Sequence, residues 1–346
     1  MRASVIIVNY NNREDLQRCL PSLLPSLGSQ DEVIVVDNAS KDGTATWLGQ
    51  TYPQVRLVIS RENLGFGGGN NLGATHASGK YLVCLNPDTT VERSWLEALI
   101  LVLENNPAAG LATSKILLLN DPQVINTCGN DVHISGITLC RGIGESRQSF
   151  TILEEVGAVS GAAFVIRRDL FDALGGFDER FFLYMEDTDL SWRARLAGFG
   201  CLYVPGSIVY HDYCLTFGPQ KTFYQERNRY LMLLKCLRRR TLLAMLPVLL
   251  FAEVVTWGFV LLKDRQNLNN KIRAYAWILR HWHSINETHQ FSRGRKFHTE
   301  RAMLASTTWR LNFSQTQQGV MMRLSKLIFD PLFFLSKTFL AVIGIA

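Results

Sequence analysis

The sequence predicts an α/β protein with a mostly parallel central sheet, helices on both faces of that sheet, and a helical tail. Three observations support this fold. Short apolar, β-branched runs alternate with helical patterns through the first 120 residues, as in parallel sheets covered by helices. Polar clusters follow several of these runs. Residues 236–346 hold the most apolar stretches of the chain and end the alternation.

The expected elements follow in chain order. Strands are expected at residues 4–9, 32–37, 56–60, 81–85, 159–167 and 201–204. Helices are expected at residues 13–27, 94–104, 169–174 and 187–196. Residues 121–158 contain several glycines and little helical periodicity, which predicts a less regular, substrate-facing excursion. The pattern divides the chain into a first domain, 1–235, and a second region, 236–346.

Composition and charge narrow the class of protein. Of the 346 residues, 47% are hydrophobic and 19% charged, which excludes a disordered chain. Seven cysteines without a CxxC pair favour reduced thiols and a cytosolic domain. Residues 1–234 hold 19 Lys and Arg against 25 Asp and Glu, and residues 235–346 hold 17 against 5, a net of +12. A basic and apolar tail, without any RNA- or DNA-binding motif, favours a membrane surface over nucleic acid.

Polar residues come directly after three of the predicted strands. Asn9 and Tyr10 end the first strand, Asp37 ends the second, and Asn86 and Asp88 follow the fourth. In open α/β sheets ligands bind at the carboxyl ends of the strands. A carboxylate there can bind Mg²⁺ or Mn²⁺, with diphosphate oxygens completing the coordination. An Asx turn is the structural alternative for residues 86–88.

An acidic cluster lies at the start of the helix predicted near residue 187. Glu186, Asp187 and Asp189 have strongly apolar sequence on both sides. Carboxylates in such surroundings tend to have shifted pKa values and functional roles. The structural alternatives are stabilisation of the helix start and a pair between Asp189 and Arg193, four residues later.

Two other features are weaker signals. The glycine-rich residues 65–69 can admit phosphate to backbone N–H groups, or can form a plain tight turn. His211 follows an apolar segment, and a lone histidine is more often structural than a ligand. The seven histidines show no zinc-binding spacing.

Taken in order, the motifs resemble a family 2 glycosyltransferase of the GT-A fold. The resemblance rests on residues 4–11 (SVIIVNYN), 35–44 (VVDNASKDGT), 62–71 (ENLGFGGGNN) and 85–89 (LNPDT), and continues at 160–162, 175–179 and 184–190. It covers residues 3–235 and is nearest to the rhamnosyltransferase-like enzymes of bacterial surface polysaccharide assembly. The ordered set is specific, although each motif alone is not.

The resemblance implies inverting transfer of a sugar, rhamnose among the candidates, from a UDP- or dTDP-linked donor to an acceptor hydroxyl. On the matched motifs, Asp37 contacts the nucleotide base. Asn9 and Tyr10 belong to the same nucleotide-sugar site. Asn63 and Gly67 belong to the loop beside the nucleotide and the sugar.

The same resemblance implies the metal site and the base. Asp88 matches the last acid of the family's metal motif, and Asn86 replaces its first acid. His211 lies where some relatives have a histidine ligand to Mg²⁺ or Mn²⁺. Asp187 matches the catalytic base, and a carboxylate in a partly apolar pocket suits that role. Glu186, Asp189 and Arg193 are expected to position the base or the acceptor.

Two other functions remain open at this stage. A catalytically inactive nucleotide-sugar-binding assembly protein is the main alternative, which the retention of Asp37, Asp88 and Asp187 disfavours. The other alternative is a related nucleotidyltransferase. The acidic cluster at the start of the helix near residue 187 disfavours it, because that chemistry does not use such a base.

The tail is expected to associate with the cytoplasmic face of a bacterial inner membrane, as a peripheral or monotopic region, where it would meet a lipid-linked saccharide acceptor. Residues 242–262 are long enough to span the bilayer but contain Glu253 and Pro247. A single crossing would send the basic segment 263–326 outside, against the positive-inside tendency. Helices that lie in or dip into one leaflet are therefore favoured over a spanning helix and over a buried helix pair.

Overall fold

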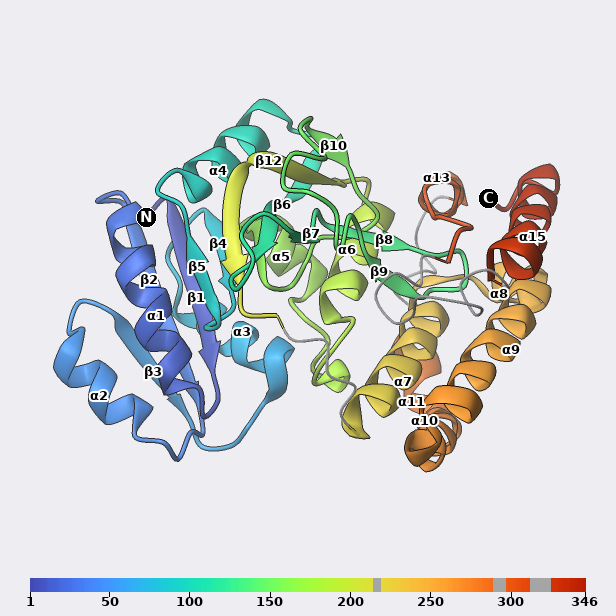
Figure 1. The fold of residues 1–346 in the computed structure, drawn as a ribbon, viewed down its shortest axis with the longest axis horizontal. Coiled ribbons are helices and arrows are strands. Elements are labelled where there is room, and N and C mark those ends of the chain that lie inside the picture. Colours follow the sequence, from blue (N-terminus) through green and yellow to red (C-terminus); the bar gives the residue numbers. More distant parts are fainter. Residues whose placement is uncertain (214–218, 289–296, 312–324) are drawn as a thin grey trace. The chain divides into compact units, whose positions relative to one another are not determined.

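The computed structural model describes residues 1–213, 219–288, 297–311 and 325–346 (Figure 1). The chain forms two compact units. The first unit comprises residues 1–130, 140–194 and 199–214, and the second comprises residues 131–139, 195–198 and 215–346. The predicted domain limits of 1–235 and 236–346 stay a prediction.

A ten-stranded sheet forms the centre of the first unit. Its main path runs β10-β12-β6-β11-β4-β1-β2-β3, with β5 paired to β12 and β7 paired to β6. The strands are β1 Ala3–Asn9, β2 Asp31–Asn38, β3 Arg56–Ser60, β4 Tyr81–Leu85, β5 Thr89–Val91, β6 Ala109–Leu118, β7 Ile125–Thr127, β10 Glu154–Glu155, β11 Ala163–Arg167 and β12 Gly200–His211. β1 to β4 are parallel to their neighbours in this group, and β11 runs antiparallel to both β4 and β6.

Helices cover both faces of this sheet, as predicted. They are α1 Arg13–Leu23, α2 Thr44–Thr51, α3 Gly65–His76, α4 Trp95–Asn105, α5 Arg168–Leu174 and α6 Glu186–Leu196. Side chains of β1 alternate between the faces. Val5 and Ile7 belong to the core with α1 and α4. Ile6 faces α3, where a Cβ on Gly73 would lie 2.4 Å from the isoleucine side chain.

One central strand differs from the sequence-based expectation. β6 was not expected, because Gly110, Ser114 and Lys115 interrupt its apolar pattern, yet these three residues are buried. The Lys115 ammonium donates to the backbone oxygens of Arg147 at 2.8 Å and Ser149 at 2.9 Å. A buried lysine is tolerated when such partners are present. The sequence pattern did not indicate β6, because its polar residues acquire hydrogen-bond partners only in the folded protein.

The second unit is mainly helical. Its helices are α7 Pro219–Cys236, α8 Arg239–Ala244, α9 Leu246–Lys263, α10 Leu268–Arg280, α11 Trp282–Thr288, α13 Phe297–Ala305 and α15 Asp330–Val342. A hairpin of β8 (Asn130–Val132) and β9 (Thr138–Cys140) lies mostly within this unit. α10 packs on α7, and α15 packs on α9. The predicted segment 242–262 is divided between α8 and α9.

Candidate functional site

The first group of predicted site residues lies at the carboxyl ends of β1 and β2. Asn9 and Asp37 are neighbours across the two strands, and both are buried. The Asn9 amide donates to the Thr44 hydroxyl at 3.2 Å, and Asp37 Oδ1 accepts from the Ser40 backbone N–H at 3.1 Å. Tyr10, the next residue after β1, is 49% exposed. At this edge the Asp37 carboxylate is thus held in place, and an accessible aromatic residue directly follows β1.

The start of α3 is held to the end of β2 by two asparagines. The Asn38 amide donates to Asn63 Oδ1 at 3.0 Å and to the Gly65 backbone oxygen at 3.1 Å. Asn63 Oδ1 also accepts from the Gly65 N–H at 2.9 Å. Sequence reasoning gave Asn38 no role, although its place directly after Asp37 was a usable signal. These bonds fix the helix start next to the nucleotide-binding candidates.

The glycine-rich residues begin a helix and do not form a turn. α3 starts at Gly65, whose φ of +71° a non-glycine residue rarely adopts. A Cβ on Gly67 would lie 3.0 Å from the Phe177 Cβ, and one on Gly69 would lie 2.5 Å from Val8. The glycines thus permit close packing of α3, whatever else the helix start binds.

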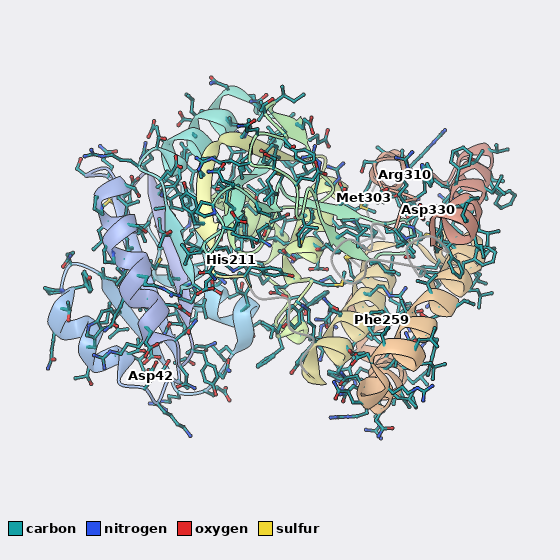
Figure 2. All side chains as sticks on the ribbon, viewed as in Figure 1. Asp42, His211, Phe259, Met303, Arg310 and Asp330 are labelled. Atoms are coloured by element: carbon teal, nitrogen blue, oxygen red, sulfur yellow. The ribbon has the colours of Figure 1, made fainter. Side chains whose placement is uncertain are left out.

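Asp88 and His211 lie together although they are far apart in the sequence. His211, labelled in Figure 2, ends β12 and pairs with Thr89 of β5, the residue that follows Asp88. Its Nε2 lies 3.3 Å from Asp88 Oδ1. Its Nδ1 lies 3.0 Å from Asn126 Oδ1. Because an amide oxygen only accepts, Nδ1 donates to Asn126, which leaves Nε2 available as a metal ligand.

This pair fits a divalent cation. Asp88 Oδ1 is buried without a hydrogen-bond partner among the described residues, since its contact with Nε2 lacks hydrogen-bond geometry. A carboxylate oxygen and an imidazole nitrogen are both ligands for Mn²⁺-type ions. No group of three or more candidate ligands occurs in the described part of the chain. A bound substrate and water could supply further ligands.

Asp187 is held by hydrogen bonds in the first unit. Its Oδ2 accepts from the Gly161 backbone N–H at 2.8 Å and from the Asn130 amide at 3.4 Å. Its Oδ1 accepts from the Thr188 N–H at 2.7 Å. Burial raises the pKa of Asp187, and the bonds from Gly161 and Thr188 oppose that rise. The carboxylate is thus oriented and more basic than an exposed aspartate.

Gly161 connects this carboxylate to the metal-binding candidates. The next residue, Ala162, accepts a hydrogen bond at its backbone oxygen from the Asn86 N–H at 2.9 Å. Asn86 itself is two residues before Asp88. The structure therefore brings Asp187 to the edge of the sheet where β4 ends. Sequence reasoning included Gly161 in a matched motif but assigned it no contact.

Glu186 has different surroundings from Asp187. Its side chain is buried, and its Oε2 has no hydrogen-bond partner among the residues described. Burial raises the pKa of Glu186, and the charge of Asp187 raises it further. Of the two, Glu186 is therefore the one that holds a proton more readily, and Asp187 is the one whose hydrogen bonds favour the ionised form.

The loop before this acidic pair is strained. Phe182, Tyr184 and Met185 have φ values of 60°, 66° and 69°, in a region that costs non-glycine residues of order 1–3 kcal/mol each. The Phe182 backbone oxygen accepts from the Phe66 N–H at 2.8 Å, which ties the loop to α3. Such strain persists where a precise backbone path is required, here immediately before Glu186.

Asp189 and Arg193 are buried and bound to each other. The Arg193 Nε donates to Asp189 Oδ2 at 2.7 Å, and its Nη1 donates to the Leu174 backbone oxygen at 2.9 Å. Both side chains are at most 4% exposed. This geometry favours a positioning role, in which the pair fixes α6 and with it the acidic pair at its start.

The comparisons with known proteins agree on one family. A family model described as glycosyl transferase family 2 matches residues 4–175. An N-acetylglucosaminyl-diphospho-decaprenol L-rhamnosyltransferase of Mycobacterium tuberculosis is 32% identical over 60% of this chain and 75% of its own length. A low-salt glycan biosynthesis hexosyltransferase of Haloferax volcanii is 26% identical over 56% of this chain and 61% of its own.

Solved structures agree with the predicted fold. GalNAc-T7, solved with UDP, GalNAc and Mn²⁺, matches with a TM-score of 0.57 and 19% identity over 67% of this chain and 47% of its own. S. aureus TarS 1–349 in complex with UDP-GlcNAc matches with a TM-score of 0.55 and 17% identity over 99% of this chain and 92% of its own. These matches confirm the predicted GT-A fold.

Proposed function

Because the chain belongs to glycosyl transferase family 2, we propose that it transfers a sugar with inversion from a nucleotide-diphosphate donor to a hydroxyl of a lipid-linked saccharide. A UDP- or dTDP-linked sugar is the proposed donor, and rhamnose is the first sugar to test because the mycobacterial relative is a rhamnosyltransferase. The product would be an intermediate of a cell-surface glycan.

One observation carries this proposal. The support is the position of three side chains: the hydrogen-bonded carboxylate of Asp187 and the neighbouring Asp88 and His211 lie at the edge where β4 ends. Inverting transfer needs both: a base for the acceptor hydroxyl and positive charge for the leaving diphosphate. A protein that only binds a nucleotide sugar needs no oriented base.

We assign the steps to residues as follows. Asp187 takes the proton of the acceptor hydroxyl as its oxygen attacks the anomeric carbon of the sugar. Asp88 and His211 would hold Mg²⁺ or Mn²⁺, which would supply positive charge for the leaving diphosphate. Asp37, with Asn9 and Tyr10, binds the nucleotide, and Asn63 and Gly67 line its sugar side. Glu186, Asp189 and Arg193 position the base.

The acceptor places the enzyme at a membrane. We propose that the helical unit associates with the cytoplasmic face of the inner membrane, because a lipid-linked saccharide stays in the bilayer. Its support is the net charge of +12 over residues 235–346 and the presence of α9, the one described helix long and apolar enough to cross a bilayer, with a mean hydropathy of 1.8.

The direct test is transfer of radiolabelled sugar to a polyprenyl-diphosphate saccharide, with a panel of UDP- and dTDP-sugars and added Mg²⁺ or Mn²⁺. The proposal expects one donor to be consumed only when the lipid-linked acceptor is present. A thermal-shift screen of the same donors measures binding separately. Stabilisation by a donor without transfer to any acceptor would favour the inactive nucleotide-sugar-binding protein and contradict the proposed activity.

A further inference from the structure

The outward side of α9 is apolar, where a helix of a soluble protein carries polar residues. Five large apolar side chains of α9 are exposed, and four of them lie along this side: Leu246, Leu250, Val254 and Leu261. Their exposed fractions run from 44% to 64%, and their spacing places them on one side of the helix. Val248 and Ala252 are buried on the opposite side. α9 therefore has one apolar side packed in the protein and a second one left uncovered in the described structure.

α15 repeats this pattern beside α9. Phe333 and Leu340 are buried, and the Phe333 ring lies 6.4 Å from that of Phe251 of α9. The opposite side of α15 exposes Leu335, Phe339 and Val342, at 62%, 55% and 80%. We call the exposed apolar sides of the two packed helices the α9–α15 surface.

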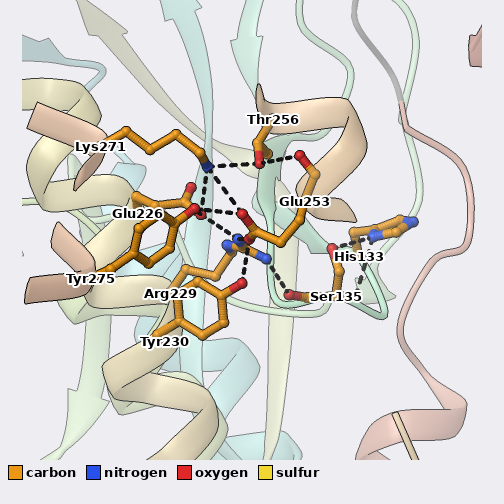
Figure 3. A network of polar contacts seen from close by, with 9 residues as sticks. All are labelled: His133, Ser135, Glu226, Arg229, Tyr230, Glu253, Thr256, Lys271 and Tyr275. Carbon is orange, nitrogen blue, oxygen red and sulfur yellow. Dashed lines mark hydrogen bonds and ion pairs between the residues drawn. The ribbon is translucent and has the colours of Figure 1, made fainter. Parts of the chain in front are cut away.

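A polar network holds α9 to α7 and α10 (Figure 3). Glu253 of α9 lies 2.6 Å from the Arg229 guanidinium of α7 and 3.4 Å from the Lys271 ammonium of α10. Tyr230 and Tyr275 donate their hydroxyls to the same carboxylate. Although burial opposes ionisation, the two cations hold the pKa of Glu253 well below its usual range. The ion pairs of Glu253 thus connect α9 to α7 and α10, and neither of these two helices is long and apolar enough to cross a bilayer.

The ion pairs of Glu253 restrict the orientation that α9 can adopt in a membrane. If α9 crossed the hydrocarbon, the ion pairs of Glu253 would either break or enter the hydrocarbon with Arg229 and Lys271. Both outcomes are costly, because unpaired buried charges and charges at the bilayer centre are strongly disfavoured. If α9 lies parallel to the bilayer plane, the network stays on the protein side and only the α9–α15 surface enters lipid.

The charges of the helical unit point to the same partner. The acidic side chains described from residue 221 onward bond within the unit: Glu226, Glu253, Asp264, Glu300 and Asp330. Arg239 and Arg240 are exposed before α9, and Lys263, its last residue, and Arg265 are exposed at its other end. Trp309 and Arg310 add an aromatic ring and a cation beside Phe334 of α15; Arg310 is labelled in Figure 2. An uncovered apolar surface bordered by cations matches an anionic lipid leaflet.

We propose that the α9–α15 surface inserts into one leaflet of an anionic bilayer, with α9 parallel to the membrane plane. This inference rests on the membrane association proposed above and specifies which residues enter lipid and that α9 does not cross. Its test measures vesicle binding and not sugar transfer, so either proposal can fail without the other.

The first experiment is flotation of the full chain with vesicles of phosphatidylethanolamine and phosphatidylglycerol. The double variant Leu250→Glu/Val254→Glu should lower the vesicle-bound fraction roughly tenfold or more, because it places charge in the lipid-facing surface. Leu101→Glu is the matched control: Leu101 is an exposed leucine, 52% accessible, on α4 of the first unit. Unchanged binding of the double variant would overturn the proposal.

The second experiment determines whether α9 crosses. Arg239→Cys, at the start of α8, and Arg265→Cys, just after α9, place single new thiols on the two sides of α9 along the chain. Wild-type protein measures the labelling of the native cysteines. After the protein binds preformed vesicles, an impermeant maleimide should label both new thiols to the same extent. Protection of one end only would show a spanning helix and overturn the parallel orientation.

A second copy of the chain is the competing occupant of this surface. Sedimentation velocity without lipid distinguishes binding of a second copy from binding of lipid. If the wild type self-associates and the double variant does not, the surface is a protein interface and the proposal is wrong. Equal sedimentation of both proteins, together with the loss of vesicle binding, supports lipid as the occupant.

Discussion

At the scale of single residues, two neighbouring carboxylates have separate roles because their partners differ. Asp187 accepts hydrogen bonds from Gly161 and Thr188, whereas Glu186 Oε2 is buried without a partner among the described residues. Hydrogen bonds to a carboxylate favour its ionised form, and burial favours the neutral one. The ionised member is the one suited to accept a proton from an acceptor hydroxyl.

We expect Asp187→Asn to lower turnover by roughly 10²–10⁴-fold, the usual range for loss of a positioned acid–base group. Donor binding should be retained, because the amide keeps the shape of the side chain. Steady-state transfer rates and nucleotide-sugar titrations measure the two effects. Glu186→Gln is the adjacent control and should keep most of the turnover. Near wild-type transfer by Asp187→Asn, or an equal loss in Glu186→Gln, would contradict the assignment.

We expect transfer to stop in EDTA and to return when Mg²⁺ or Mn²⁺ is added. His211→Ala should raise the metal concentration needed for half-maximal activity by roughly tenfold or more, because it removes a direct ligand. His76→Gln, at the far end of α3, is the control histidine and should leave the metal dependence unchanged. Full activity of the wild type in EDTA would refute the metal site and leave His211 with a structural role.

At the scale of elements, α3 packs closely on the sheet because its glycines lack side chains. Gly73 faces β1 and β2: a Cβ there would lie 2.4 Å from Ile6 and 3.2 Å from Val36. These neighbours are branched core side chains that cannot move without displacing others. The glycines of this helix therefore hold α3 close to the strands that end in Asn9 and Asp37.

We expect Gly73→Ala to destabilise the protein by about 1–3 kcal/mol, the usual cost of overpacking a core. Gly49→Ala is the matched control, because Gly49 lies in α2 with nothing within 4 Å of its added Cβ. That control should stabilise the protein by about 0.4–1 kcal/mol, since alanine restricts the unfolded chain. Urea unfolding curves of both variants test the prediction, and equal stabilities would contradict it.

At the scale of the whole molecule, we expect a buried histidine of the helical unit to make stability depend on pH. His133 Nδ1 lies 2.7 Å from the Ser135 hydroxyl and accepts from the Ser135 N–H at 3.2 Å. Its Nε2 donates to the Trp309 backbone oxygen at 3.2 Å. The neutral ring is thus fully bonded, and burial lowers the pKa of His133 from 6.5 to about 3.

This lowered pKa predicts a pH dependence of stability. Because the folded pKa lies below the unfolded one, the unfolded chain binds the extra proton between pH 6.5 and about 3. The contribution of His133 to the free energy of unfolding is fully present above pH 6.5. Below pH 6.5 this contribution falls by up to about 1.4 kcal/mol per pH unit.

His133→Gln should therefore show a shallower loss of stability than the wild type between pH 6.5 and pH 4. The difference between their unfolding free energies, measured by urea denaturation across this range, isolates the histidine from the carboxylates that titrate nearby. His76→Gln should follow the wild-type curve. Parallel curves for His133→Gln and the wild type would show that His133 does not control acid stability.

The sequence by itself determined the features that depend on neighbours along the chain. The apolar runs of β1, β2 and β4 were predicted because side-chain periodicity is local, and Asn9, Asp37 and Asp88 were placed at their ends for the same reason. The ordered motifs also indicated the GT-A fold and the family. The roles of individual site residues stay predictions.

Only the tertiary structure decided which distant residues meet. It paired His211 with Asp88, held Asp187 on Gly161, and gave Glu253 its partners Arg229 and Lys271. In the sequence Glu253 is an isolated charge in an apolar segment; in the fold it is the residue that ties α9 to two polar helices. The sequence alone does not determine the free energy of a charged side chain, because that energy depends on its burial and on its partners in the folded protein.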